Sequence, residues 1–198
     1  MISINQPIIL ASQSPRRKEL LSRVFGNVRI LVIESDETVP PDTLPSKAAS
    51  AIALRKMEIA KSVVQENCII ITADTIVSFN DRILGKPAGK DEAFSMLKLL
   101  SANTHQVFTG YSVYDIESSR QITGVEETRV TFNCLSEQDI NSYVASGSPL
   151  DKAGGYGIQD AFGSIFVQSI KGCYYNVMGL PISKIYNVIK QINYDRKS

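Results

Sequence analysis

The sequence lacks several features that would assign it to a common class of protein. Its 198 residues carry 21 Lys and Arg against 20 Asp and Glu, so the formal net charge is only +1. A chain with so little net charge has no general attraction for nucleic acid, and any anion site must be local. The longest apolar runs, near residues 68–77, are far shorter than a membrane span. We therefore expect neither a nucleic acid nor a membrane as a partner.

Cysteine and histidine are equally sparse. Cys68, Cys134 and Cys173 are odd in number, widely spaced and without a C-x-x-C pair, which argues against a disulfide framework and a structural zinc site. Free thiols, together with an N-terminus that does not resemble a signal peptide, predict a cytoplasmic location. His105 is the single histidine. Because no G-x-S-x-G elbow accompanies it, we interpret it as a structural residue at the start of a strand.

The familiar nucleotide motifs are also missing. The chain contains neither G-x-G-x-x-G nor G-x-x-x-x-G-K-[ST], which excludes the common dinucleotide and Walker-type sites. What the sequence does contain begins in residues 8–25. Ile8 to Leu10 predicts a short buried strand, and Ser14 followed by Pro15 predicts the cap and first residue of a helix.

The start of this helix carries the groups that an anion site needs. Ser12 and Ser14 supply hydroxyls, and Arg16 and Arg17 supply guanidiniums. Arginine at a helix start opposes the helix dipole, which is understandable if an anion binds there. A phosphate would be held by the free backbone N–H groups and by a bidentate guanidinium. The alternative is an ordinary capped helix with two solvated arginines.

The rest of the chain alternates helices and strands. Strands are expected at 29–33, 68–79, 82–84, 106–115, 121–134 and 165–170, and helices at 47–65 after a Ser46 cap, at 90–100, at 136–146 and from 182 onward. Segments 106–115 and 121–134 predict a long antiparallel hairpin, so the sheet should be mixed rather than parallel. We expect an α/β fold with two lobes that share the sheet around a cleft, in a single domain over residues 1–198.

Asp74 lies in the middle of the most strand-like stretch. A charge inside an apolar strand is costly unless it is paired or bound to a metal. The alternative ends the strand at Thr72 and places Asp74 in a turn. The β-branched residues that resume at Thr75 argue for a continuous strand instead.

Other charged groups would complete a site around Asp74. The proline-containing loop 34–45 offers Glu34, Asp36 and Glu37 as candidate carboxylates. One of them, paired with Asp74, would form a magnesium or manganese site, because these ions take oxygen ligands and retain waters. Lys86 is held in a rigid bend between a glycine and a proline, which suits a positioned charge.

A series of short motifs runs through the chain in order. They are Leu-Ala-Ser-Gln-Ser-Pro-Arg-Arg at 10–17, Ser-Asp-Glu at 35–37, Lys56, Ala-Asp-Thr at 73–75, Gly-Lys-Pro at 85–87, Thr-His-Gln-Val at 104–107, Thr-Gly at 109–110, Asp-Lys-Ala-Gly-Gly-Tyr-Gly-Ile-Gln at 151–159, and Val-Met-Gly-Leu-Pro at 177–181. Together they make the chain resemble the Maf family of nucleoside triphosphate pyrophosphatases. The resemblance implies an elongated fold similar to inosine triphosphate pyrophosphatases, an active site in the cleft between the lobes, and a homodimer.

The resemblance also implies a reaction and roles for these residues. A nucleoside triphosphate would be hydrolysed to the monophosphate and pyrophosphate. Asp74 would be the general base that activates water, and Glu37 with Asp74 would hold the magnesium or manganese ion. The phosphates would be bound by Ser12, Ser14, Arg17, Lys56 and Lys86.

Three further positions bear on the substrate. Arg16, Thr75 and Gln159 resemble the branch of the family that acts on dTTP and UTP, whereas members that prefer methylated guanine nucleotides differ at these positions. We therefore expect a dTTP and UTP pyrophosphatase that removes these nucleotides from the pool. The alternatives are a methyl-GTP pyrophosphatase and a nucleotide-sensing regulator of septum formation, which would bind nucleotide without turning it over.

Overall fold

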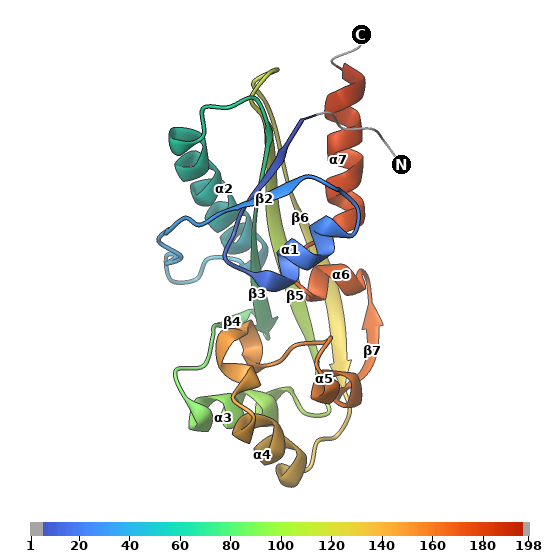
Figure 1. The fold of residues 1–198 in the computed structure, drawn as a ribbon. Coiled ribbons are helices and arrows are strands. Elements are labelled where there is room, and N and C mark those ends of the chain that lie inside the picture. The colour runs from blue at the N-terminus through green and yellow to red at the C-terminus, as the bar shows by residue number, and fades with distance from the viewer. Residues whose placement is uncertain (1–5, 196–198) are drawn as a thin grey trace.

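One seven-stranded mixed sheet runs through the elongated molecule (Figure 1). The computed structural model describes residues 6–195. The sheet has the order β2-β1-β3-β5-β6-β7, and β4 pairs with β3 off this path. Its strands are β1 (Ile8–Ala11), β2 (Val28–Leu31), β3 (Ile69–Phe79), β4 (Arg82–Leu84), β5 (Thr104–Asp115), β6 (Arg120–Phe132) and β7 (Val167–Lys171).

The strand directions confirm the expected mixed sheet. β1 pairs in parallel with both β2 and β3, whereas β3 pairs antiparallel with β5. β5 and β6 form the predicted long hairpin, and β6 also pairs with β7. The β3–β5 ladder is continuous from Ile69 opposite Asp115 to Ser78 opposite Gln106. Asp74 therefore lies within the strand, and the alternative that placed it in a turn is wrong.

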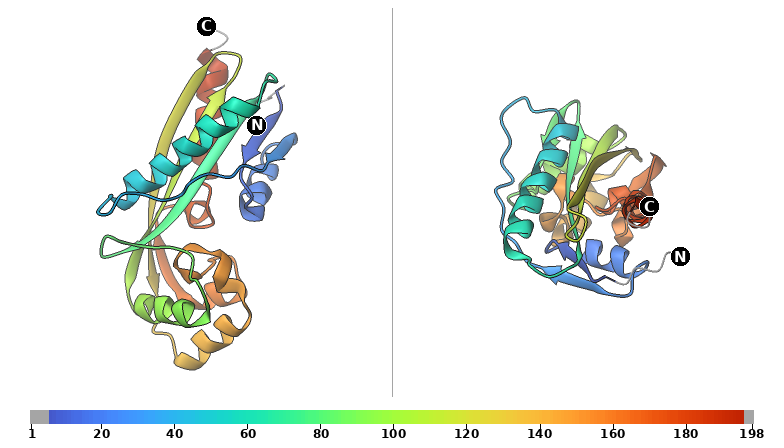
Figure 2. Two further views of the ribbon diagram at one scale, coloured as in Figure 1. Left: turned by 90° about the vertical axis from the view of Figure 1, so that its left-hand side faces the viewer. Right: turned by 90° about the horizontal axis from the view of Figure 1, so that it is seen from above.

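Helices cover both faces of the sheet (Figure 2). They are α1 (Pro15–Ser22), α2 (Pro45–Val63), α3 (Lys90–Leu100), α4 (Glu137–Ala145), α5 (Ala161–Phe166), α6 (Tyr174–Val177) and α7 (Ile182–Asp195), with short 3₁₀ turns η1 (Ser148–Asp151) and η2 (Ala153–Gly155). α2 packs on one face, and α1 and α7 lie on the other. None of the helices in the described part of the chain has the length and apolar character needed to cross a membrane.

The alternation of side chains along β3 explains why this strand is apolar on both sides. Ile69 and Ile71 pack in the main core, which includes residues of α1 and α7, whereas Ile70 packs against Met57 of α2. Successive residues of a strand point to opposite faces, so a strand covered on both faces needs apolar residues throughout. Asp74 is an exception to this pattern, and it therefore marks the part of the sheet that is built for something other than packing.

Gly110 brings α2 close to the sheet. It lies on β5 directly opposite Asp74 of β3, and a side chain at this position would collide with the backbone of Ala49 in α2. The lack of a side chain lets the helix lie against the strand. This close approach carries Lys56, further along α2, to the middle of β3.

Several local predictions are confirmed. Ser14 caps α1, with Pro15 as its first residue. Ser136 caps α4, and its hydroxyl accepts from the backbone N–H of Asp139. The three cysteines are free, as expected. His105 is a buried structural residue whose Nε2 lies 2.7 Å from the Tyr156 hydroxyl, and burial lowers its pKa to about 4, so its ring is neutral at neutral pH.

Most predicted starts are within two residues of the observed ones, and two of the differences, at α2 and β7, have a clear physical cause. Ser46 does not cap α2, because the helix begins at Pro45 after Leu44. The fixed φ of proline suits the first helical position and starts the helix before the serine. The predicted strand at 165–170 begins only at Val167, because Phe166 ends the short helix α5 and packs in the core from there.

Candidate functional site

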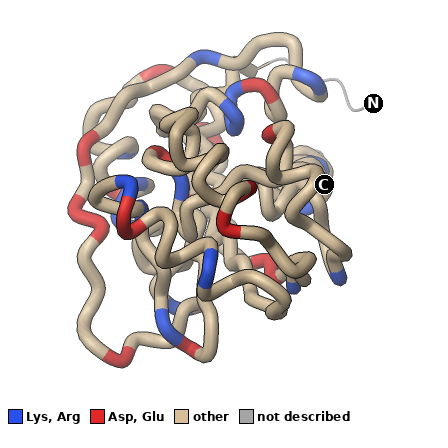
Figure 3. Tube along the Cα trace, turned by 90° about the horizontal axis from the view of Figure 1, so that it is seen from below, with Lys and Arg blue, Asp and Glu red and all other residues tan. Residues whose placement is uncertain are grey.

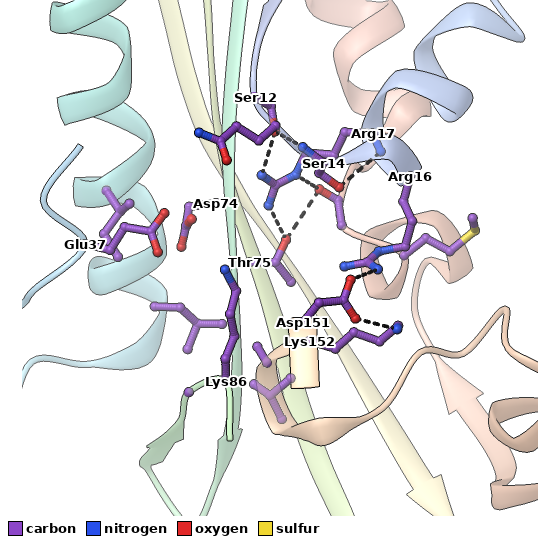
Figure 4. A pocket seen from close by; sticks show the side chains of 18 of the residues that line it. Ser12, Ser14, Arg16, Arg17, Glu37, Asp74, Thr75, Lys86, Asp151 and Lys152 are labelled. Carbon is purple, nitrogen blue, oxygen red and sulfur yellow. Dashed lines mark hydrogen bonds and ion pairs between the residues drawn. The ribbon is translucent and has the colours of Figure 1, made fainter. Parts of the chain in front are cut away.

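A cleft of about 820 Å³ lies where β1 ends, α1 begins and β3 passes its midpoint. Figure 4 shows side chains from these elements pointing into it. The cleft is lined by all the residues to which the resemblance assigns a role: Ser12, Ser14, Arg16, Arg17, Glu37, Lys56, Asp74, Thr75, Lys86 and Gln159. The fold thus brings together side chains that lie up to 147 positions apart in the sequence, from Ser12 to Gln159. Asp36, another loop carboxylate considered for the metal, is outside the lining and pairs with Arg55.

One side of the cleft, here called the carboxylate wall, consists of Glu37, Lys56 and Asp74. The Lys56 Nζ donates to Glu37 Oε1 at 2.6 Å and to Asp74 Oδ1 at 2.7 Å. Asp74 and Lys56 are both buried, whereas half of the Glu37 side chain is exposed. The buried charge that the sequence flagged at Asp74 is therefore paired, as a charge in that position requires.

The charges of the cleft also act on Glu37. Burial alone would raise the pKa of the Glu37 carboxyl. The hydrogen bond and charge of Lys56, aided by the charges of Lys86 and Arg17, outweigh that effect and hold the pKa below its usual range. Glu37 is therefore ionised at neutral pH and available to a cation.

The opposite side, here called the arginine wall, consists of Ser12, Ser14, Arg16 and Arg17 at the start of α1. The buried Arg17 guanidinium donates from Nε to the Gly179 carbonyl at 2.8 Å, from Nη1 to Ser12 Oγ at 3.2 Å, and from Nη2 to Thr75 Oγ1 at 3.0 Å (Figure 4). All three acceptors are uncharged. No carboxylate in the described chain forms an ion pair with Arg17, so its charge faces the cleft uncompensated by direct contact.

Burial also affects Arg17 itself. Desolvation lowers the pKa of the guanidinium, Asp74 and Glu37 oppose this change, and Arg16 adds to it. An arginine nonetheless stays charged in proteins. A buried cation that donates to neutral oxygens is stabilised further when an anion arrives, which favours the anion-site interpretation of this helix start over the ordinary capped helix.

Arg16 points away from Arg17 and towards the glycine-rich segment. Its Nη1 lies 3.1 Å from Asp151 Oδ2. Asp151 in turn accepts from Lys152 Nζ at 2.6 Å, and the pKa of Asp151 is lowered because Lys152 and Arg16 outweigh its desolvation. Lys152 is buried, and it also donates to the Ser148 carbonyl. From the sequence, Asp151 and Lys152 were identified only as part of a motif, although a lysine within a glycine-rich segment is the signal that could have singled them out.

The remaining candidates, Thr75, Gln159 and Lys86, also line the cleft. Thr75 follows Asp74 on β3, and its hydroxyl accepts from Arg17 and lies 2.9 Å from that of Thr109. Gln159 is exposed, and its amide donates to Asp160 at 3.0 Å. Lys86 is exposed on the bend after β4, and within the described chain it has no ion pair or hydrogen bond. Its ammonium is therefore available to a ligand.

The carboxylate wall has suitable donors for a divalent cation. Residues 6–195 hold no group of three or more His, Cys, Asp or Glu side chains placed around a common point. Magnesium is nevertheless commonly bound by one or two carboxylates, with waters and substrate phosphates as the other ligands. Glu37 and Asp74 fit that mode, since both carboxylates already share one cation, the Lys56 ammonium.

Charges of both signs are interspersed over the molecule seen from below (Figure 3). This view has no broad basic face of the kind that binds a nucleic acid backbone. The excess of positive charge is local to the cleft, where Arg16, Arg17, Lys56 and Lys86 all contribute to the lining.

The chain is similar in sequence to known proteins over nearly its whole length. The profile of a family described as Maf-like protein matches residues 7–192. A dTTP/UTP pyrophosphatase of Bacillus anthracis is 50% identical over 190 residues, covering 95% of this chain and 96% of the relative. One of Bacillus cereus (strain B4264) is 49% identical with the same coverage. Among solved structures, the Ham1 protein of Staphylococcus aureus matches 64% of this chain and 72% of its own at 12% identity, with a TM-score of 0.42.

Proposed function

The chain belongs to the Maf family, and from that premise we propose that it hydrolyses dTTP and UTP to the nucleoside monophosphate and pyrophosphate. The curated relatives at about 50% identity that bear this activity in their names support the proposal. The observation that carries it is the cleft itself. A buried carboxylate, Asp74, faces uncompensated cations across a space large enough for a nucleotide.

Asp74 is the proposed general base. Its Oδ1 accepts from Lys56, whereas Oδ2 has no hydrogen-bond partner in the described chain. The free oxygen is available to take a proton from a water molecule, which then attacks phosphorus as the bridge between the α- and β-phosphates breaks. A general base of this kind contributes about a hundredfold to ten-thousandfold to the rate.

The arginine wall and Lys86 are the proposed phosphate site. Arg17 keeps its fork in place with three neutral acceptors. Ser12 and Ser14 lie beside it at the start of α1, where Ser14 Oγ accepts from the backbone N–H of Arg17. Cations that are already in position when charge shifts towards the leaving pyrophosphate stabilise the transition state without reorganising. The buried Arg17 supplies such a charge, and Lys86 supplies a second one from the other side of the cleft.

Glu37 and Asp74 are the proposed holders of a magnesium or manganese ion. When bound, the ion would neutralise phosphate oxygens and orient the triphosphate. The contribution of the protein is to hold the two carboxylates close together. Lys56 already does so through its two hydrogen bonds.

Arg16, Thr75 and Gln159 are the proposed base-selecting residues. Arg16 and Gln159 both line the cleft and carry N–H donors. Thymine and uracil present carbonyl oxygens to such donors, and the Gln159 amide can also accept from the ring N–H. Arg16 is fixed by Asp151, so its guanidinium reaches the cleft in a defined position. The location of Thr75 against Arg17 links base selection to the phosphate site.

A substrate panel tests the proposal. Pyrophosphate release should be measured across canonical and methylated nucleotides with magnesium, manganese and neither metal, and dTTP and UTP should be the best substrates. A methylated guanine nucleotide as the best substrate would favour the methyl-GTP alternative. Tight nucleotide binding without release of pyrophosphate would favour the sensing alternative. The homodimer and the cytoplasmic location also remain predictions, and light scattering during gel filtration tests the first of them.

A further inference from the structure

The ammonium of Lys56 lies between the two carboxylates that are proposed to hold the metal. It donates to Glu37 Oε1 at 2.6 Å and to Asp74 Oδ1 at 2.7 Å, and only 11% of the Lys56 side chain is exposed. The sequence predicted that Lys56 binds phosphate. In the structure two of the three N–H donors of its ammonium are directed to the carboxylates, so a full turn towards a phosphate would release them.

The charges around this lysine are unfavourable to a bare metal ion. The field at Glu37 comes from Lys56, Lys86 and Arg17, so three cations face two carboxylates, Glu37 and Asp74. A divalent ion that approached without a nucleotide would enter a region with a net positive charge. It would also compete with a buried ammonium for the same carboxylates, and that competition is strong where burial weakens solvent screening.

Lys56 differs from the other two cations in its freedom to move. Arg17 is fixed by three hydrogen bonds to neutral acceptors on three different segments. Lys86 touches neither carboxylate through a hydrogen bond or ion pair. Lys56 contacts both carboxylates through a flexible four-carbon stem whose ammonium has no fixed orientation. It is thus the cation that can leave the carboxylates.

We propose that Lys56 acts as an internal substitute for the metal, so that a divalent cation enters the site only together with a triphosphate. This inference rests on the proposed nucleotide site. In the free protein the lysine neutralises Glu37 and Asp74. The triphosphate supplies the negative charge that makes room for the divalent ion, and the lysine turns from the carboxylates to the phosphates. Metal and nucleotide are therefore bound with positive coupling.

The test measures binding of Mn²⁺ rather than turnover. The signal of free Mn²⁺ in electron paramagnetic resonance gives the affinity with and without a thymidine triphosphate analogue that cannot be cleaved between its α- and β-phosphates, once the Mn²⁺ that the analogue binds without protein is subtracted. The wild-type protein should bind Mn²⁺ at least about tenfold more tightly with the analogue, within the usual range of coupling between two ligands. Without nucleotide, Lys56→Met should bind Mn²⁺ at least about tenfold more tightly than the wild type, because the competing charge is gone.

Lys86→Met is the matched control. It removes one positive charge from the same cleft, but from a side chain that does not contact the carboxylates. Its affinity for Mn²⁺ alone should rise much less than that of Lys56→Met. An equal rise in both variants would overturn the proposal in favour of a general effect of charge.

Two other results would overturn the inference. In the first, the wild-type protein binds Mn²⁺ as tightly without the analogue as with it. In the second, Lys56→Met without the analogue binds Mn²⁺ no more tightly than the wild type does. Lys56→Met leaves Asp74 without its partner. If the variant does not fold for this reason, the affinity of the wild type for Mn²⁺ with and without the analogue decides. If the analogue does not bind, the affinities of the wild type and of Lys56→Met for Mn²⁺ without nucleotide decide. Pyrophosphate release tests the proposed function separately, so the two failures are distinguishable.

Discussion

On the carboxylate wall, Lys56 lies between two carboxylates, whereas on the arginine wall Arg17 donates to one carbonyl and two hydroxyls. Both cations are buried, and both donate hydrogen bonds to protein partners. The charge of Lys56 is neutralised within the protein, whereas the charge of Arg17 is available to a ligand. The number of hydrogen bonds alone does not reveal this difference, because the charge of the acceptors decides it.

The comparison shows how one cleft can serve a metal and an anion at once. A wall with paired charges can exchange its own cation for another. A wall with a fixed, unpaired cation can only gain an anion. The following experiments would separate these two behaviours, beginning with the largest effect that we expect.

Removal of the divalent metal tests the carboxylate wall, because only this wall is proposed to hold the ion. Excess chelator should abolish release of pyrophosphate, and added magnesium or manganese should restore it, because Glu37 and Asp74 are oxygen ligands of the type these ions prefer. The thermal midpoint should change little in chelator, since Lys56 pairs both carboxylates without metal. Full activity in chelator would remove the metal from the mechanism.

Asp74→Asn should reduce kcat by about a hundredfold to ten-thousandfold, the usual cost of losing a general base. The change is nearly isosteric, so β3 should still form. An amide cannot take a proton from water near neutral pH, whereas nucleotide affinity should change far less. The measurement is pyrophosphate release and nucleotide binding on one preparation of confirmed thermal stability.

Glu37→Gln is the matched control for Asp74→Asn. It removes the other carboxylate from Lys56 but leaves the proposed base in place. Its loss of kcat should be smaller, and high metal concentration should recover part of it. Equal and unrecoverable losses in both variants would show that the two carboxylates do not divide their roles in this way.

Arg17→Ala should lower kcat/KM by about tenfold to a hundredfold, because a hydrogen bond to a charged group contributes roughly 1.5–3 kcal/mol. Arg17→Lys restores the charge but not the fork that reaches Gly179, Ser12 and Thr75. It should therefore recover only part of the loss. Steady-state kinetics with dTTP measure both variants. An unchanged kcat/KM in Arg17→Ala would return the helix start to a structural role.

The smallest effect is expected from Asp151→Asn, which frees Arg16 from its partner. Because 62% of the Asp151 side chain is exposed, the ion pair is worth at most about 1 kcal/mol. We expect up to about a fivefold fall in the preference for dTTP over a purine triphosphate, seen in KM more than in kcat. Glu127→Gln, which removes the exposed partner of Arg129 on β6, should leave the preference unchanged.

Local patterns in the sequence predicted a large part of the fold. The run of β-branched residues around Asp74 indicated a continuous strand, and the Ser14–Pro15 pair indicated where α1 begins. Both signals depend on neighbouring residues alone. The error at Ser46 has the same origin, since two adjacent residues, Pro45 and Ser46, each favour a helix start and only the packed helix shows which one prevails.

The pairing of the site residues could not be predicted in this way. The residue pattern alone placed Arg16 and Arg17 together at one helix start, and only the family resemblance assigned Arg17 to the phosphates and Arg16 to the base. In the structure they diverge, because their partners Asp151 and Gly179 lie 135 and 162 positions further along the chain. The contact of Lys56 with Asp74 likewise depends on the approach of α2 to Gly110, which is a property of the packed protein. Composition and periodicity do not encode such distances.

The unbroken β3–β5 ladder has a mechanical consequence. Ten consecutive residue pairs, from Ile69 opposite Asp115 to Ser78 opposite Gln106, pass behind the cleft, and Asp74 lies near their middle. At this level β5 pairs with β3 on one side and with β6 on the other, so a hinge here would have to break backbone hydrogen bonds on both sides of β5. The two ends of the molecule are therefore not free to swing together around a nucleotide as separate rigid bodies would. Adjustment to the substrate falls to individual side chains and to the irregular segment 32–44, which carries Glu37.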